Sequence, residues 1–278
     1  MTIRLTILCE NSVARPFGLL GEHGFACYLE TPQGNYLFDT GQGKTLLPNA
    51  RCLEKDLTTI KALLISHGHY DHTGGLQPLL EHSSGLDIYA HPAIFTTRYW
   101  EIEGRRHDVG IPWRRDYLES LGARFQLQKE LIEVGPGVYL TGEIPRRNDF
   151  EKGDTNQLAV TAEGCIQQPD PLADDLSMVV TSQKGLILVL GCAHAGLVNI
   201  IKYVTQKFPG QRIHAVVGGT HLGFADDEQF EQTLKTLDRF QIDKLGVSHC
   251  TGLPKAAQLA ARLGDRFFFG NVGTVIEA

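Results

Sequence analysis

The sequence predicts a mixed α/β fold that forms one domain. Short apolar runs typical of buried strands recur along the chain, and several of them end in a glycine-containing loop. Segment 197–207 has the 3.6-residue apolar spacing of a helix, shown by Leu197, Ile200, Ile201 and Val204. At 278 residues the chain is long for one domain, but α/β and sandwich folds of this size are commonly single units. We therefore expect one domain over residues 1–278.

Strands dominate the first two thirds of the chain, and helices alternate with strands in the last third. The expected strands are 2–9, 25–30, 35–39, 62–65, 86–90, 137–143, 158–160, 177–181, 186–190, 213–217, 244–247 and strands around 266–277. The expected helices are a short helix or turn at 55–60, a helix start at 75–80, and the helices 197–207, 227–240 and 254–263.

Residues 93–125 depart from this pattern. The stretch holds both tryptophans, Trp100 and Trp113, and arginines alternate with its aromatic side chains. One interpretation is a surface excursion anchored by its aromatic residues. The other is a lid that encloses a substrate and supplies arginines to an anion. The sequence leaves both open.

Composition excludes several classes of protein. A formal charge of −6 and a pI near 6.0 argue against a nucleic-acid partner. No apolar run approaches the roughly 18 residues of a membrane span, and the N-terminus resembles a strand rather than a signal peptide. We expect a cytoplasmic protein with no membrane partner. A homo-oligomer remains compatible with the sequence.

The cysteines indicate free thiols rather than disulfides. Six are scattered without CxxC spacing: Cys9, Cys27, Cys52, Cys165, Cys192 and Cys250. Cys192 and Cys250 adjoin histidines, so either one could border a site, although a small buried thiol also explains each of them.

The most informative segment is residues 66–75. His67, His69, Asp71 and His72 place three imidazoles and one carboxylate within six positions, directly after an apolar strand. Neutral imidazole and ionised carboxylate suit Zn²⁺, with iron or manganese as alternatives. A polar loop with solvated histidines would not need this density of ligand types. The segment therefore predicts a metal site.

Further histidines occupy the same place in other strand–loop units. His194, His221 and His249 each follow an apolar strand, and Asp39 ends another. Strand ends on one edge of a sheet sandwich converge in space, so we expect these side chains to meet.

The His-x-His-x-Asp-His pattern resembles the signature of the metallo-β-lactamase superfamily, and the resemblance extends along the chain. It implies a four-layer αββα sandwich with two metals. His67 and His69 would hold the first, and Asp71 and His72 the second. The resemblance also implies that Asp39 supports a ligand histidine, although a turn-forming role explains it nearly as well.

The resemblance further implies two more ligands and a bridging group. In the superfamily a histidine and then an aspartate usually come before the final histidine, whereas here Asp175 precedes one strand and His194 ends the next. Asp175, His194 and His249 would complete the ligand set, with the bridge left open between the first two. His221 would contact the substrate or orient a ligand, or exchange roles with His249.

Several short sequence motifs are similar to those of one branch of that superfamily. They are Glu22-His-Gly24, Thr141-Gly-Glu-Ile-Pro-Arg146, Asp174-Asp175, Gly191-Cys-Ala-His-Ala-Gly196, Gly218-Gly-Thr-His-Leu222 and His249-Cys-Thr-Gly252. Members of the branch are described as dihydropterin-ribofuranosylaminobenzene-phosphate synthases or as metal-dependent hydrolases.

Three functions follow as hypotheses. The first is a hydrolase in which metal-bound hydroxide attacks a small anionic phosphoester, since a metal lowers the pKa of water from about 15.7 to about 7. The second is a transferase that condenses a dihydropterin with ribofuranosyl-aminobenzene phosphate, and the third is a non-catalytic metal-dependent sensor.

Residue roles accompany the two enzymatic hypotheses. We expect the catalytic residues to be Asp71, His194 and His221, and the substrate-binding residues to be His23, Trp113, Arg146 and Arg147. The arginines would pair with a phosphate, and aromatic side chains would stack on a pterin ring.

Overall fold

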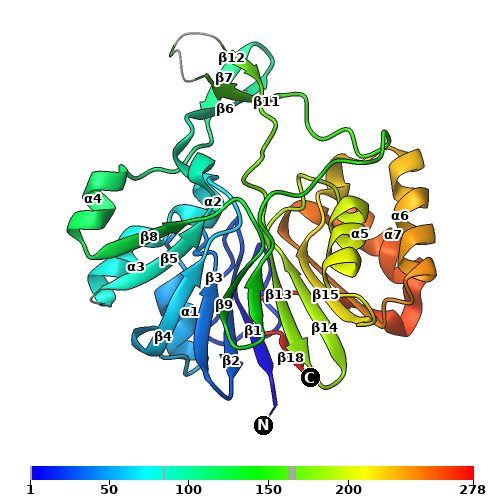
Figure 1. The fold of residues 1–278 in the computed structure, drawn as a ribbon, viewed down its shortest axis with the longest axis horizontal. Helices are drawn as coiled ribbons and strands as arrows, with labels where there is room; N and C mark the ends of the chain where they lie inside the picture. Colours follow the sequence, from blue (N-terminus) through cyan, green and yellow to red (C-terminus); the bar gives the residue numbers. More distant parts are fainter. Residues whose placement is uncertain (1, 84, 162–163, 165–166) are drawn as a thin grey trace.

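The computed structural model describes residues 2–83, 85–161, 164 and 167–278. Two seven-stranded sheets lie face to face, and helices cover their outer faces (Figure 1). The predicted α/β fold with αββα layering is thereby confirmed. Cys165 lies outside the described residues, and the other five cysteines are free.

The first sheet is formed mainly by the N-terminal half of the chain. Its strands, in spatial order, are β18 (Val275–Glu277), β1 (Arg4–Cys9), β2 (Ala26–Thr31), β3 (Gly34–Phe38), β4 (Ile60–Leu64), β5 (Leu86–Ala90) and β8 (Ala123–Leu127). Helices α1 (Leu46–Cys52), α3 (Leu76–His82) and α4 (Arg115–Ser120) lie on its outer side (Figure 1).

The second sheet is formed by the C-terminal half. Its strands are β17 (Phe267–Phe269), β16 (Lys244–Ser248), β15 (Ile213–Gly219), β14 (Gly185–Leu190), β13 (Ser177–Ser182), β10 (Val138–Leu140) and β9 (Ile132–Gly135). Helices α5 (Leu197–Lys207), α6 (Asp227–Arg239) and α7 (Leu253–Leu263) cover it. Among the described residues, no helix is long and apolar enough to cross a membrane.

The interior between the two sheets is fully apolar at its centre. Leu29 and Phe38 of the first sheet and Val180 and Ile187 of the second belong to one buried cluster, with at most 1% of each exposed. Burying one such side chain stabilises the fold by about 1.5–3 kcal/mol. This core fixes the two sheets against each other, and with them the loops at their shared edge.

A third sheet, which we call the cap sheet, stands above that edge (Figure 1). It consists of β12 (Gln167–Pro169), β11 (Gln157–Val160), β6 (Arg98–Ile102) and β7 (Arg105–Asp108). Only the first part of the expected lid at 93–125 belongs to the cap sheet. Its later part, α4 and β8, packs into the first sheet, while the cap sheet takes two strands from residues far downstream.

Parallel strands explain why chemically active loops gather beneath the cap sheet. Strands β3, β4 and β5 run parallel, as do β14, β15 and β16, so within each set the loops that follow the strands lie on one edge. Four short helical turns occur in these loops: α2 (Tyr70–Thr73), η2 (Pro92–Phe95), η3 (Leu222–Phe224) and η4 (His249–Thr251). The remaining 3-10 turns are η1 (Leu57–Thr59) and η5 (Gly264–Arg266).

Candidate metal centre and substrate pocket

Asp39 anchors the loop that carries the histidine motif. It follows β3 in the left-handed backbone region, with φ of 58°, a conformation that costs energy for a residue with a side chain. Its Oδ1 accepts the Ser66 N–H at 2.7 Å, and its Oδ2 lies 2.7 Å from both Ser66 Oγ and His72 Nδ1. The carboxylate thus fixes the ring orientation of His72. Burial lowers the pKa of His72, but the charges of Asp39 and Asp71 outweigh it and raise the pKa to about 9.

One group of potential ligands combines His67, Cys192 and His194, whose ligand atoms lie within 4.8 Å of one another. His69 joins this group, since its Nδ1 lies 3.0 Å from His67 Nε2 and its ring centroid lies 5.0 Å from that of His194. Burial lowers the pKa of His69 to about 3 and those of His67 and His194 well below 6.5. The three imidazoles are therefore neutral near pH 7, which is the form that binds a metal.

A second group lies beside the first and shares Cys192 with it. Cys192, His72 and His249 place their ligand atoms within 4.8 Å of one another, and Cys192 Sγ is 3.2 Å from His72 Nε2. His23, Asp71 and His249 form a third such group, in which Asp71 Oδ2 lies 3.1 Å from His249 Nε2. His249, with φ of 50°, donates its backbone N–H to Glu10 Oε1 at 2.8 Å.

Unpartnered buried atoms indicate that these groups fit divalent metals. Among the described residues, no hydrogen-bond partner is found for His69 Nε2 or for either ring nitrogen of His194 and His221. Leaving such atoms unpaired in the interior is costly, so a metal or ligand is the natural partner. Imidazole, carboxylate and one cysteine sulfur form a donor set typical of zinc. The sequence analysis treated Cys192 only as a possible neighbour; its signal was its place in the same strand-end loop as His194.

His221 lies above the first group. Its backbone is left-handed, with φ of 54°, and its N–H donates to Cys250 Sγ at 3.3 Å. The ring centroid lies 4.3 Å from that of His194, and Phe224 stacks on its other side at 4.7 Å. His221 therefore lies beside His194 and lines the same pocket as the candidate ligands.

The predicted ligand Asp175 and its neighbour Asp174 have different surroundings. Asp174 accepts the Gly68 N–H at 2.8 Å and pairs with Arg98. Asp175 Oδ2 accepts the Ala195 N–H at 2.8 Å, while its buried Oδ1 has no partner among the described residues. Burial raises the pKa of Asp175 to about 6. Asp175 is not in any of the three ligand groups. It contacts the loop of His194 instead.

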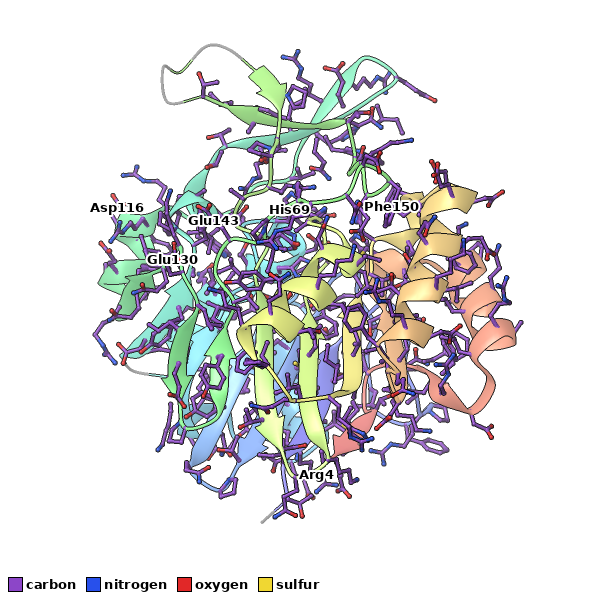
Figure 2. The ribbon with its side chains drawn as sticks, turned by 45° about the vertical axis from the view of Figure 1, so that its right-hand side comes forward. Arg4, His69, Asp116, Glu130, Glu143 and Phe150 are labelled. Atoms are coloured by element: carbon purple, nitrogen blue, oxygen red, sulfur yellow. The ribbon has the colours of Figure 1, made fainter. Side chains whose placement is uncertain are left out.

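A pocket of about 430 Å³ opens over the candidate ligands. Figure 2 shows His69 beneath the cap sheet, on the side where this pocket lies. Aromatic and polar side chains line it together with the ligands: Tyr70, Trp100, Asp154, Gln157 and Phe224. None of the described residues that line it is a lysine or an arginine.

The predicted substrate-binding residues separate into two sets. His23 lines the pocket and places its Nε2 3.2 Å from Asp71 Oδ2. Trp113 lines a different hollow and donates its indole N–H to Gly74 O at 3.1 Å. Arg146 donates to the carbonyls of His194 and Pro171, and Arg147 donates to Gln206 Oε1. The structure thus places Trp100 where the sequence analysis expected Trp113.

A family model matches most of the chain, and two known proteins match nearly all of it. A family model described as the metallo-β-lactamase superfamily matches residues 21–217. A 7,8-dihydropterin-6-methyl-4-(β-D-ribofuranosyl)-aminobenzene-5'-phosphate synthase from Methanocaldococcus jannaschii is 29% identical over 99% of this chain and 96% of its own length. The crystal structure of Tm1679, described as a metal-dependent hydrolase of the β-lactamase superfamily, is 27% identical, with a TM-score of 0.84 and 99% of both chains covered.

Proposed function

This chain belongs to the metallo-β-lactamase superfamily, and from that premise we propose that it is a metal-dependent transferase acting on a dihydropterin. The observation that carries the proposal is the pocket over the ligand groups, which has aromatic walls and neither lysine nor arginine among its described lining residues. Such a pocket suits a flat, uncharged ring better than a phosphate. The full-length similarity to the M. jannaschii synthase supports the same substrate class.

Two metals would be held by the groups described above. His67, His69 and His194 would hold one, and Asp71, His72 and His249 the other. Cys192 lies within reach of both groups and would contribute a sulfur ligand to both. We assign zinc first, with iron or manganese as alternatives. A divalent metal at such a site supplies a Lewis acid and, at neutral pH, an ionised water.

The chain's own residues would orient the substrate and move a proton. In such a condensation the arylamine nitrogen would form a bond to the pterin methyl carbon, the activated hydroxyl group on that carbon would leave with its bonding electrons, and the nitrogen would lose a proton. His221 lines the pocket and has both ring nitrogens free of partners among the described residues, so we assign it as the proton acceptor. Asp71 and His194, also expected to be catalytic, would act as ligands.

A phosphoester hydrolase is the second candidate. The similarity to Tm1679 favours it, because that protein is described as a metal-dependent hydrolase. The expected phosphate-binding arginines do not support it, since neither Arg146 nor Arg147 lines the pocket and both already donate to other groups of the protein.

One experiment separates the two candidates. Protein purified without chelator is assayed for metal content, for binding of a dihydropterin, and for turnover of phosphomonoesters and phosphodiesters. We expect about two metals per chain, pterin binding and condensation with the aminobenzene partner, without ester turnover. Ester turnover without pterin binding would establish the hydrolase instead, and metal with neither activity would favour a sensor.

A further inference from the structure

The wall of the pocket formed by the cap sheet presents a carboxylate held in a fixed position. Trp100 of β6 donates its indole N–H to Asp154 Oδ2 at 3.1 Å, and Asp154 Oδ1 accepts the Asn156 N–H at 2.9 Å. The strand register places Gln157 of β11 directly opposite Trp100. Asp154 and Gln157 therefore line the pocket beside Trp100, Gln157 from the first position of β11 and Asp154 from the segment just before that strand.

Gln157 supplies an independent sign of a missing ligand. Its side chain is 8% exposed and lines the pocket, yet its Oε1 has no partner among the described residues. A buried acceptor without a partner costs free energy, and a donor on a bound molecule would remove that cost.

The remaining walls define the shape and charge of what can bind. Tyr70 and Phe224 add aromatic surface, and Phe224 keeps 60% of its surface exposed although it stacks on His221. No described residue of the lining is a lysine or an arginine. Hydrogen-bond acceptors between aromatic walls favour a flat ring whose edge facing the acceptors carries N–H donors and no negative charge.

We infer that Asp154 and Gln157 recognise the hydrogen-bond-donor edge of a flat aminoheterocycle, and that Trp100 holds Asp154 in place to do so. The recognised edge is an exocyclic amino group with the adjacent ring N–H. Asp154 and Gln157 are thus specificity-determining residues, and Trp100 is a positioning residue. The inference rests on the proposed function, because the substrate class there is a pterin, which carries such an edge.

The test compares two rings that differ on this edge alone. Pterin carries an amino group at position 2, and lumazine carries an oxygen there. Metal-loaded protein is titrated with each ring, and dissociation constants are obtained from the fluorescence of the ring. We expect pterin to bind at least about tenfold more tightly, the size expected of one hydrogen bond to a charged group.

Three variants and one control show which residues cause the preference for pterin over lumazine. Asp154→Asn keeps the shape of the side chain but removes its charge, and it should reduce the pterin preference by about tenfold. Gln157→Met removes the amide and should reduce the preference by several-fold. Trp100→Phe keeps an aromatic face but frees Asp154, so the preference should fall while lumazine affinity stays nearly unchanged. Glu103→Gln, on an exposed turn of the cap sheet, should leave both constants unchanged.

The outcomes separate this inference from the proposed function. If the protein binds pterin but Asp154→Asn and Gln157→Met keep the full preference, the inference is wrong and the proposed function stands. If the protein binds pterin and lumazine equally well, the inference is also wrong and the proposed function again stands. If the metal-loaded protein binds neither ring, the pterin substrate class fails, and the inference falls with it. Melting temperatures of all four variants check that each is folded.

Discussion

Arg98 and Asp174 form a buried two-point ion pair that joins the cap sheet to the histidine loop. Arg98 Nη1 and Nη2 lie 2.8 and 2.6 Å from the two carboxylate oxygens, and the side chains are 1% and 0% exposed. Asp174 Oδ2 also accepts the Gly68 N–H, in the middle of the metal motif. Asp170 accepts from Arg98 Nε at 2.6 Å, so one guanidinium holds two carboxylates. The position of the cap sheet is thereby tied to the geometry of the candidate ligands.

Arg98→Ala should destabilise the protein by about 3–5 kcal/mol, because it leaves the Asp174 carboxylate buried without its partner. Chemical denaturation measures the loss. The matched control is Arg106→Ala on the same sheet, whose ion pair with Glu101 is exposed and should contribute less than about 1 kcal/mol. Equal effects of the two substitutions would contradict the structural role given to Arg98.

His69→Ala should remove metal from the first ligand group and abolish activity with it. The ring of His69 is buried, and its Nε2 has no partner among the described residues. Alanine at this position has no side-chain atom that could bind a metal in its place. Metal content per chain, determined by elemental analysis, is the measurement. His107→Ala changes an exposed histidine of the cap sheet and should leave the content unchanged. Full metal content together with full activity in His69→Ala would refute the assignment.

Cys192→Ser should lower the occupancy of both metals, because Cys192 lies in both ligand groups. Serine preserves the size of the side chain but binds zinc far less well than a thiolate does. Cys52→Ser, at an exposed free cysteine, is the control. Loss of a single metal would show that Cys192 belongs to one group and does not bridge them.

Asp175→Asn should reduce metal content if the predicted ligand role is correct. Asparagine can still accept the Ala195 N–H, so the local fold is expected to persist. Elemental analysis and a melting curve on the same samples give the answer. A change in melting temperature with unchanged metal content would make Asp175 a structural residue of the His194 loop.

Glu151→Ala should destabilise helix α5 by about 1–2 kcal/mol, the usual size of a helix-capping interaction. The buried Glu151 carboxylate accepts the N–H groups of Val198 at 2.7 Å and Asn199 at 2.9 Å, whereas the N-cap residue Gly196 has no side chain to do so. Asp149→Ala, at an exposed neighbour, should cost little.

The loss caused by Glu151→Ala should also depend on pH. Burial raises the pKa of Glu151 above its usual 4.5, so the folded state holds the proton over a range in which the unfolded state has released it. Stability from this group is therefore complete below pH 4.5 and falls as pH rises through the raised pKa. The difference in unfolding free energy between wild type and variant should shrink over that range. A difference that grows with pH would contradict the direction of the shift.

The fold class, the central strands and the first set of candidate ligands could be predicted from the sequence. Strands such as β4 and β14 are buried on both faces, so their apolar runs are readable without a structure, and His67 to His72 lie close together because they are close in sequence. Only the tertiary structure decided which distant groups meet them. The proximity of Cys192 to both ligand groups depends on how the two sheets pack. The cap sheet pairs exposed, charged strands such as Arg105–Asp108, whose composition carries no apolar period. Trp100 rather than Trp113 reaches the pocket because strand pairing of β6 with β11, a long-range contact, sets its position.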